Sequence, residues 1–227
     1  PATNLLVSLF FAKNRFMQLV VLGNDEMKNE LVQDTTVNGA EVVWLTDAAS
    51  FLDYPSAGLF IDLLYDNSEN RKSILRRLQA PMLINSVIET LAETDETFIR
   101  INGWPTFLEG KTIEAACLQE ENKGNVEKAL SHLGKEVAWL PDVPGFVTPR
   151  VVSMIINEAF LALEEGVSTP EEIDTAMKLG TAYPYGPFEW GKKIGLQNIA
   201  TLLQTLSAKQ PRYIPAPLLL HEVDKAI

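Results

Sequence analysis

Apolar and polar residues follow two different patterns along this chain, and the change comes near residue 142. Before that point, short apolar runs alternate with amphipathic segments. The run 16–23 is almost continuously apolar and ends in glycine, which is typical of a parallel strand buried on both faces. Further strands are predicted at 41–46, 58–65, 81–86, 98–101, 112–118 and 136–140.

The segments between these strands favour helices. They are predicted at 25–37, 70–78, 87–92 and 125–133, and Asn38-Gly39 is expected to stop the first in a left-handed conformation. Strands and helices in alternation indicate an α/β domain with a mostly parallel, Rossmann-like sheet, assigned to residues 1–143. The first β-helix-β unit has about the 30 residues that open a dinucleotide-binding domain.

The stretch 142–150 separates the two halves and opens a long helix. Pro144-Gly145 predicts a turn. From 151 to 167 apolar residues recur about every 3.6 positions, so one broad face of that helix is expected to be buried. Thr148 is expected to be the N-cap before Pro149, because a proline in the first turn lacks only an N–H that the helix would leave unpaired.

Residues 144–227 are predicted to form an all-α domain. Thr169-Pro-Glu-Glu172 is a capping box with proline at the first helical position, so a helix begins there and is expected to stop at Gly180. Further helices are predicted at 188–194, 196–206 and 218–226. Their apolar faces suit packing on a partner subunit as well as on each other.

Composition narrows the function. A chain of 227 residues with 46% hydrophobic and 22% charged residues has an ordinary soluble, globular composition. The net charge of −11 argues against a nucleic-acid partner. A single cysteine, Cys117, suits a reducing cytoplasm, and no run of about 18 apolar residues predicts a membrane span. The apolar octet Leu5 to Ala12 is interpreted as a packing segment or an ordered leader, not a signal peptide. No metal site is predicted, because no His or Cys lies near the acidic clusters.

A series of short motifs runs through the second half: Asp142-Val-Pro-Gly-Phe-Val-Thr-Pro-Arg150, Asn157-Glu-Ala159, Glu164-Glu-Gly-Val167, Glu172-Ile-Asp-Thr-Ala-Met-Lys-Leu-Gly180, Tyr183-Pro184, Gly186-Pro-Phe-Glu189 and Ile194-Gly-Leu196. Their order and spacing resemble the C-terminal domain of the 3-hydroxyacyl-CoA dehydrogenases. Over residues 16–140 the resemblance is one of layout, and most signature residues are changed. The resemblance implies a Rossmann domain that binds NAD, a helical domain that forms homodimers, and a catalytic His–Glu pair in the cleft between them.

The family's NAD-binding loop, strand-G-x-G-x-x-G-helix, aligns with Gly23 to Lys28, where only Gly23 is kept. Asp25 and Glu26 put carboxylates at the start of the following helix, so that helix is expected to cap itself where relatives bind phosphate. NAD bound in an altered pose is the alternative. The ribose-binding acid should end the second strand. The candidate cofactor-binding residues are therefore Gly23, Asp25, Met27, Thr46 and Asp47.

The resemblance also locates the catalytic pair. Counting back about a dozen residues from Glu114 places Asn102 where the family has its histidine, so these two are the candidate catalytic residues. An amide cannot accept a proton near neutral pH, and the two histidines, His132 and His221, lie off the motif. Glu114 could act as a base only if its pKa were raised. The alternative is a polar residue at a strand position.

The substrate residues that the family implies are partly kept. Its S-N-T-S loop matches residues 84–87 in part, which makes Asn85 and Ser86 candidates for substrate contact, with plain turn formation as the alternative. Pro149 stands where relatives have an asparagine. The insertion after the second strand is shortened to Ala48–Ser56, so a helical hairpin expected to help hold CoA is absent.

Two hypotheses follow. The favoured one is a degenerate family member that keeps the fold for dimerisation, or for binding an acyl-CoA-like ligand or a protein partner, without turnover. The alternative is an active NAD-dependent oxidoreductase that converts 3-hydroxyacyl-CoA to 3-oxoacyl-CoA in fatty-acid metabolism.

Overall fold

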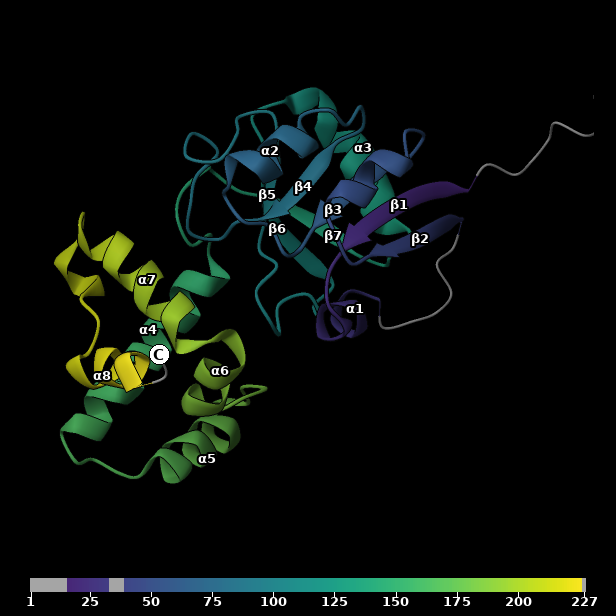
Figure 1. Ribbon diagram of the computed structural model, residues 1–227. Coiled ribbons are helices and arrows are strands. Elements are labelled where there is room, and N and C mark those ends of the chain that lie inside the picture. Colours follow the sequence, from purple (N-terminus) through teal and green to yellow (C-terminus); the bar gives the residue numbers. More distant parts are fainter. Residues whose placement is uncertain (1–15, 33–38, 226–227) are drawn as a thin grey trace, which may run out of the picture.

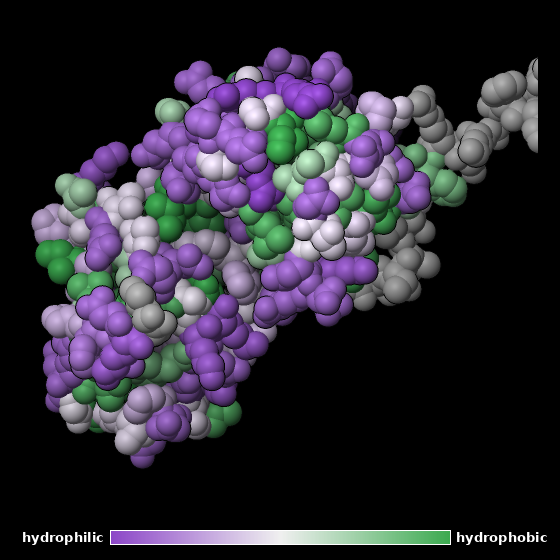
Figure 2. Space-filling model, in the orientation of Figure 1, coloured by the Kyte–Doolittle hydropathy of each residue, from purple (hydrophilic) through white to green (hydrophobic). Residues whose placement is uncertain are grey.

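The chain forms an α/β domain and a helical domain that lie side by side as two lobes (Figure 1). A computed structural model describes residues 16–32 and 39–225. The expected roles of Leu5 to Ala12 and Asn38, and the second half of the predicted helix 25–37, lie outside those residues. Figure 2 shows a mainly hydrophilic outer surface on this side of both lobes, with hydrophobic residues visible in the recess between them.

A single sheet of seven strands forms the centre of the α/β domain within the described residues. The order is β2-β1-β3-β4-β5-β6-β7, and every neighbouring pair is parallel except β5 with β6. The prediction of a mostly parallel, Rossmann-like sheet is confirmed. The strands are β1 (Met17–Leu22), β2 (Ala40–Leu45), β3 (Leu59–Asp62), β4 (Met82–Asn85), β5 (Ile99–Ile101), β6 (Thr112–Ala116) and β7 (Glu136–Trp139).

Both faces of the sheet are covered, which explains why its strands are almost continuously apolar. Leu19 and Val21 pack in one core with residues of α1 (Asp25–Leu31) and α3 (Glu120–Ser131). Val20 and Leu22 point to the opposite core, which includes residues of the 3-10 helix η1 (Ala49–Asp53) and of α2 (Glu69–Leu75). The alternation follows from the two-residue period of a strand.

Three local predictions are wrong in detail. The segment 87–92 is a series of turns and bends and not a helix, because several of its backbone groups bond to distant parts of the chain. The Val87 carbonyl, for example, accepts from the Gly145 N–H at 2.7 Å, and the Leu91 N–H donates to Asp142 at 2.9 Å. Helix α3 begins at Glu120, five residues before the predicted start, and α1 has Leu31 as its last helical residue.

The helical domain is built around α4 (Thr148–Glu164). Asn157, only 2% exposed, holds a distant turn: its Oδ1 accepts from the Ala216 N–H at 2.7 Å and its Nδ2 donates to the Ile214 carbonyl at 3.1 Å. The predicted capping box at Thr169 is present. The other helices are α5 (Pro170–Thr181), α6 (Pro187–Ile194), α7 (Leu196–Ser207), the 3-10 turn η2 (Pro211–Tyr213) and α8 (Pro217–Lys225). Within the described ranges, no helix has the length and apolarity needed to cross a bilayer.

Candidate functional site

Asn102 and Glu114, predicted as a pair, lie side by side. Because β5 and β6 are antiparallel, the Asn102 N–H donates to the Glu114 carbonyl at 3.0 Å and the two side chains share one face. The Asn102 Nδ2 lies 3.2 Å from the Glu114 Oε2. Both residues are buried, at 3% and 8% exposure, where the strands end near the helical domain.

The Glu114 carboxylate reaches across to the first turn of α4. Its Oε1 accepts from the backbone N–H groups of Val147, at 3.2 Å, and Thr148, at 3.0 Å. Its Oε2 accepts from the Thr148 hydroxyl at 2.7 Å. The prediction of Thr148 as the N-cap is therefore wrong. Val147 holds that position, and the cap comes from a different domain.

The remaining polar atoms of this group are also satisfied. The Asn102 Nδ2 donates a second time, to the Thr148 Oγ1 at 3.1 Å, and its Oδ1 accepts from the Trp104 N–H at 3.3 Å. Pro149, at the candidate substrate position, is buried in the first turn of α4 and offers no side-chain donor. An amide, a hydroxyl and a capped carboxylate give no group ready to accept a proton from a substrate.

The candidate substrate residues Asn85 and Ser86 hold the strand ends together. The Asn85 Nδ2 donates to the carbonyls of Leu63, at 3.1 Å, and Gly103, at 3.2 Å, and its Oδ1 accepts from the Gly103 N–H at 3.0 Å. A Cβ on Gly103 would lie 2.8 Å from the Asn85 Cγ, so glycine permits this approach. The Ser86 hydroxyl donates to the Glu89 carbonyl at 3.1 Å and stabilises a turn.

In the loop after β1, a residue of the loop itself caps the following helix. Asn24 is the N-cap of α1 and its Oδ1 accepts from the Met27 N–H at 2.9 Å, while Asp25 and Glu26 lie in the first turn. A Cβ on Gly23 would meet Leu63 at 3.3 Å and Trp44 at 3.4 Å, so side chains already cover that face of the glycine.

At the end of β2, the candidate cofactor-binding residue Asp47 is also hydrogen-bonded within the chain. Asp47 caps η1 by accepting from the Ser50 N–H and hydroxyl, at 3.1 and 2.6 Å, and these bonds lower the pKa of Asp47. Thr46 is exposed after β2, and Met27 packs partly buried against the core. A pyrophosphate needs unpaired N–H groups and open backbone at the first loop. The residues present do not fit a dinucleotide held there in the family's manner.

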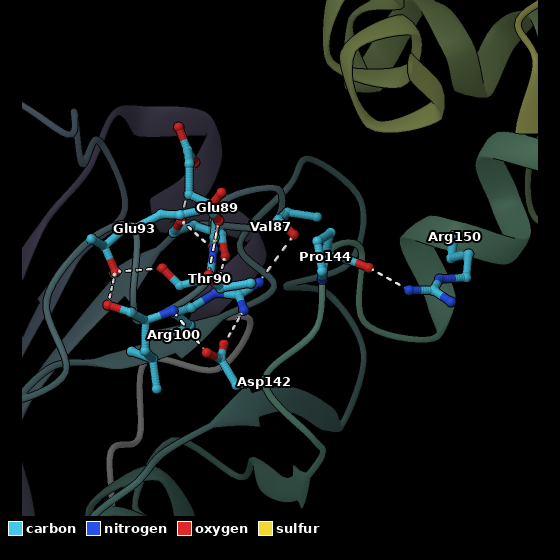
Figure 3. Close-up of polar contacts among 11 residues, drawn as sticks. Val87, Glu89, Thr90, Glu93, Arg100, Asp142, Pro144 and Arg150 are labelled. Atoms are coloured by element: carbon cyan, nitrogen blue, oxygen red, sulfur yellow. Dashed lines mark hydrogen bonds and ion pairs between the residues drawn. The ribbon is translucent and has the colours of Figure 1, made fainter. Parts of the chain in front are cut away.

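Arg100 is an element of the site that the sequence analysis did not identify. This fully buried residue on β5 donates from Nε to the Ser86 carbonyl at 2.9 Å and from Nη2 to the Val87 carbonyl at 3.1 Å. Its third nitrogen pairs with Asp142, which also accepts from the Leu91 N–H at 2.9 Å (Figure 3). The signal was one charged residue inside an apolar strand, because such a residue is buried only with a partner.

A second contact between the domains centres on Thr106, a non-glycine residue with φ of 75°. Both oxygens of Glu30, on α1, lie 2.9 Å from the Thr106 N–H. Trp190, on α6, donates from its indole nitrogen to the Thr106 hydroxyl at 2.7 Å and stacks on Phe107. Two helices, α1 and α6, thus hold a backbone conformation that a β-branched residue rarely adopts. Burial raises the pKa of Glu30.

The helical domain carries two pockets, of about 730 and 800 Å³, and neither is lined by a residue of the α/β domain. The smaller is a groove between α4 and α5. Its lining is mainly apolar and includes Val151, Met154, Ile155, Ile173 and Met177. No residue of α5 is buried, although the helix is amphipathic. Among the described residues, no cluster of His, Cys, Asp or Glu could hold a metal ion.

Comparison with known proteins identifies the family. Residues 145–226 match the model of the 3-hydroxyacyl-CoA dehydrogenase C-terminal domain. The helical domain therefore belongs to the family of 3-hydroxyacyl-CoA dehydrogenase C-terminal domains. The chain is 39% identical over 142 residues to 3-hydroxyadipyl-CoA dehydrogenase of Escherichia coli K12, covering 59% of this chain and 30% of that protein. It is 30% identical over 189 residues to 3-hydroxybutyryl-CoA dehydrogenase of Bradyrhizobium diazoefficiens, covering 76% and 64%.

A solved structure extends the family likeness to both domains. The (S)-3-hydroxybutyryl-CoA dehydrogenase of Ralstonia eutropha superposes with a TM-score of 0.73 at 25% identity, covering 93% of this chain and 94% of that one. The chain spans between 30% and 64% of the length of the two curated relatives named above. The family and fold expected from the motifs are thus confirmed, while loss of activity stays a prediction.

Proposed function

We propose that this chain is a 3-hydroxyacyl-CoA dehydrogenase family member that has lost the family's proton-transfer chemistry and acts as a non-catalytic, homodimerising unit. The observation that carries the proposal is the bonding of Glu114. Both of its oxygens accept hydrogen bonds from within the chain, and its neighbour at the family's histidine position is the amide of Asn102. A general base must have a free lone pair within reach of the substrate hydroxyl, and this pair offers none.

The cofactor loop supports the same proposal. Hydride transfer in the family needs NAD, whose pyrophosphate would approach the backbone at Gly23. There Leu63 and Trp44 cover the glycine, and α1 is capped by Asn24. Exposed carboxylates at Asp25 and Glu26 would repel a phosphate at close range.

The helical domain supports the dimerisation part. Val151 on the groove is 53% exposed, and α5 shows its apolar residues to solvent. An apolar face of this kind on a small domain marks a protein interface more often than a solvated surface. A second copy of the chain is the partner that we propose, through α4 and α5.

The experiment is an NADH titration of the purified protein, followed by fluorescence transfer from tryptophan, with a 3-hydroxybutyryl-CoA dehydrogenase as the positive control. We expect no saturable transfer up to millimolar NADH, and no oxidation of NADH with acetoacetyl-CoA. Saturable binding in the micromolar range together with turnover would support the active oxidoreductase instead. The variant Asn102→His restores the family's residue, and we expect it to remain inactive because the carboxylate beside it stays occupied by α4.

A further inference from the structure

In the helical domain, a carboxylate from another element bonds first-turn N–H groups of α4, α6 and α8. The carboxylates at α4 and α6 each accept from two backbone N–H groups. The N-cap of α6 is Gly186, and Asp174 supplies the acceptors: its Oδ1 takes the Phe188 N–H at 2.8 Å and its Oδ2 the Glu189 N–H at 3.0 Å. The N-cap of α4 is Val147, and the corresponding acceptor is Glu114.

The two caps differ in where the carboxylate comes from. Asp174 lies on α5, so its bonds stay within the helical domain. Glu114 lies on β6, the last strand but one of the sheet, so its bonds cross the boundary between the domains. The first N–H groups of a helix have no intrahelical acceptor, and the helix dipole favours a negative charge beside them. The cap on the 17-residue α4 therefore ties this central helix to the sheet.

The neighbours of Glu114 fix its orientation. Its Oε2 receives the Thr148 hydroxyl and the Asn102 amide, and these two groups also lie 3.1 Å from each other. Asn102 is in turn held by the Trp104 N–H. Charge-assisted bonds of a buried carboxylate are among the stronger hydrogen bonds in proteins. The carboxylate thus has one orientation, and in it both oxygens serve α4.

We propose that Glu114, at a position where the family places a catalytic residue, is an interdomain clasp that couples the helical domain to the sheet through the N-terminus of α4. The clasp goes beyond the proposed loss of activity and does not depend on it, because the bonds hold the domains whether or not a ligand binds elsewhere. Asn102 and Thr148 orient the carboxylate, and the contact of Glu30 and Trp190 with Thr106 is a second point of attachment.

The test compares Glu114→Gln with Asp174→Asn, since each removes the charge of a helix cap and only the first crosses the domains. Amide hydrogen exchange, read residue by residue by NMR, is the measurement. In Glu114→Gln we expect the Val147 and Thr148 amides to exchange at least about tenfold faster, as losing bonds to a charged acceptor implies. We also expect α4 to α8 to lose protection at a lower denaturant concentration than the sheet does.

Asp174→Asn is the matched control, because it removes a cap that lies within one domain. Asp174→Asn should speed exchange at Phe188 and Glu189 alone and leave the two domains unfolding together. If Glu114→Gln leaves the Val147 and Thr148 amides unchanged, or if Asp174→Asn separates the domains equally, the clasp is refuted. If Glu114→Gln does not fold, Thr148→Val decides, with an expected acceleration of roughly threefold to fivefold at the same amides and refutation if there is none. NADH binding by the wild type would overturn the proposed function but not this coupling.

Discussion

The two domains differ in their polar and apolar side chains. In the α/β domain, the polar side chains at the carboxyl edge of the sheet, such as Asn24, Asn85 and Glu114, are bonded to the chain itself. In the helical domain, apolar side chains remain uncovered: Leu179 is 83% exposed and Ile214 is 61% exposed.

The contrast indicates what each domain is suited to bind. Ligand sites in open α/β folds need unpaired polar groups at the carboxyl ends of the strands, and protein interfaces need uncovered apolar area. In the α/β domain these polar groups are hydrogen-bonded within the chain, whereas the helical domain leaves apolar side chains exposed. The family's sequence motifs persist in the second domain, where residues 145–226 match the family model. This match is consistent with the proposed homodimer interface in the helical domain.

The largest expected effect tests whether the polar groups of the α/β domain are structural. In Arg100→Met we expect the free energy of unfolding to fall by about 3–5 kcal/mol, because the change leaves Asp142 and two buried carbonyls without their donor. Chemical denaturation followed by circular dichroism measures it. Arg77→Met, at an exposed arginine of the same domain, is the control and should change little. Equal stabilities for the two variants would show that the Arg100 network is not structural.

Arg100 also shows how far the sequence alone could go. The runs that became β1 and α4 were predicted well, because hydrophobic periodicity reports which faces are buried. The pairing of Asn102 with Glu114 was likewise predicted, from family spacing. The partners of Arg100 could not be, because Asp142 lies 42 residues away and no local pattern encodes that contact.

Local rules failed where a tertiary contact replaced them. Thr148 has the residue type of an N-cap, yet Glu114 supplies the cap from another domain, and the helix begins one residue earlier than expected. The segment 87–92 has helix-forming residues, but Gly145 and Asp142 bond its Val87 carbonyl and its Leu91 N–H. The approach of Trp44 and Leu63 to one side of Gly23 depends on strands that meet only in the folded sheet.

The next prediction concerns the uncovered surface of the helical domain. In Val151→Glu we expect the dissociation constant of the proposed homodimer to rise at least about 100-fold, roughly 3 kcal/mol, because a charge would be buried in the apolar groove. Analytical ultracentrifugation across a concentration series measures it. Leu118→Glu is the matched control, since both residues are 53% exposed and Leu118 lies in the α/β domain. A dimer unaffected by Val151→Glu, or disrupted equally by the control, would exclude this groove as the interface.

The smallest expected effect concerns Asp62, at the carboxyl end of β3. It tests whether the polar groups at this edge of the sheet serve only to pair with other groups of the chain. Its side chain is fully buried and accepts from the Leu64 N–H at 3.1 Å and from Arg71 at 3.0 Å. Burial raises the pKa of Asp62 to about 6, and the attraction of Arg71 offsets only part of that rise. The folded state therefore holds this proton more tightly than the unfolded chain does.

The sign of the pH dependence follows from that proton. The stability contributed by Asp62 is fully present below the ordinary aspartate pKa and is lost as the pH rises through about 6. Measured against Asp62→Asn, the wild type should lose up to about 3 kcal/mol between about pH 4 and pH 7, since one pKa unit corresponds to about 1.4 kcal/mol. Denaturation of both proteins across this range gives the difference, with the exposed Asp53→Asn as control. A difference that stays constant with pH would mean that Arg71 keeps the carboxylate charged throughout. The edge of the sheet would then hold a stable buried ion pair, a stronger case of the internal pairing that distinguishes this domain from its helical neighbour.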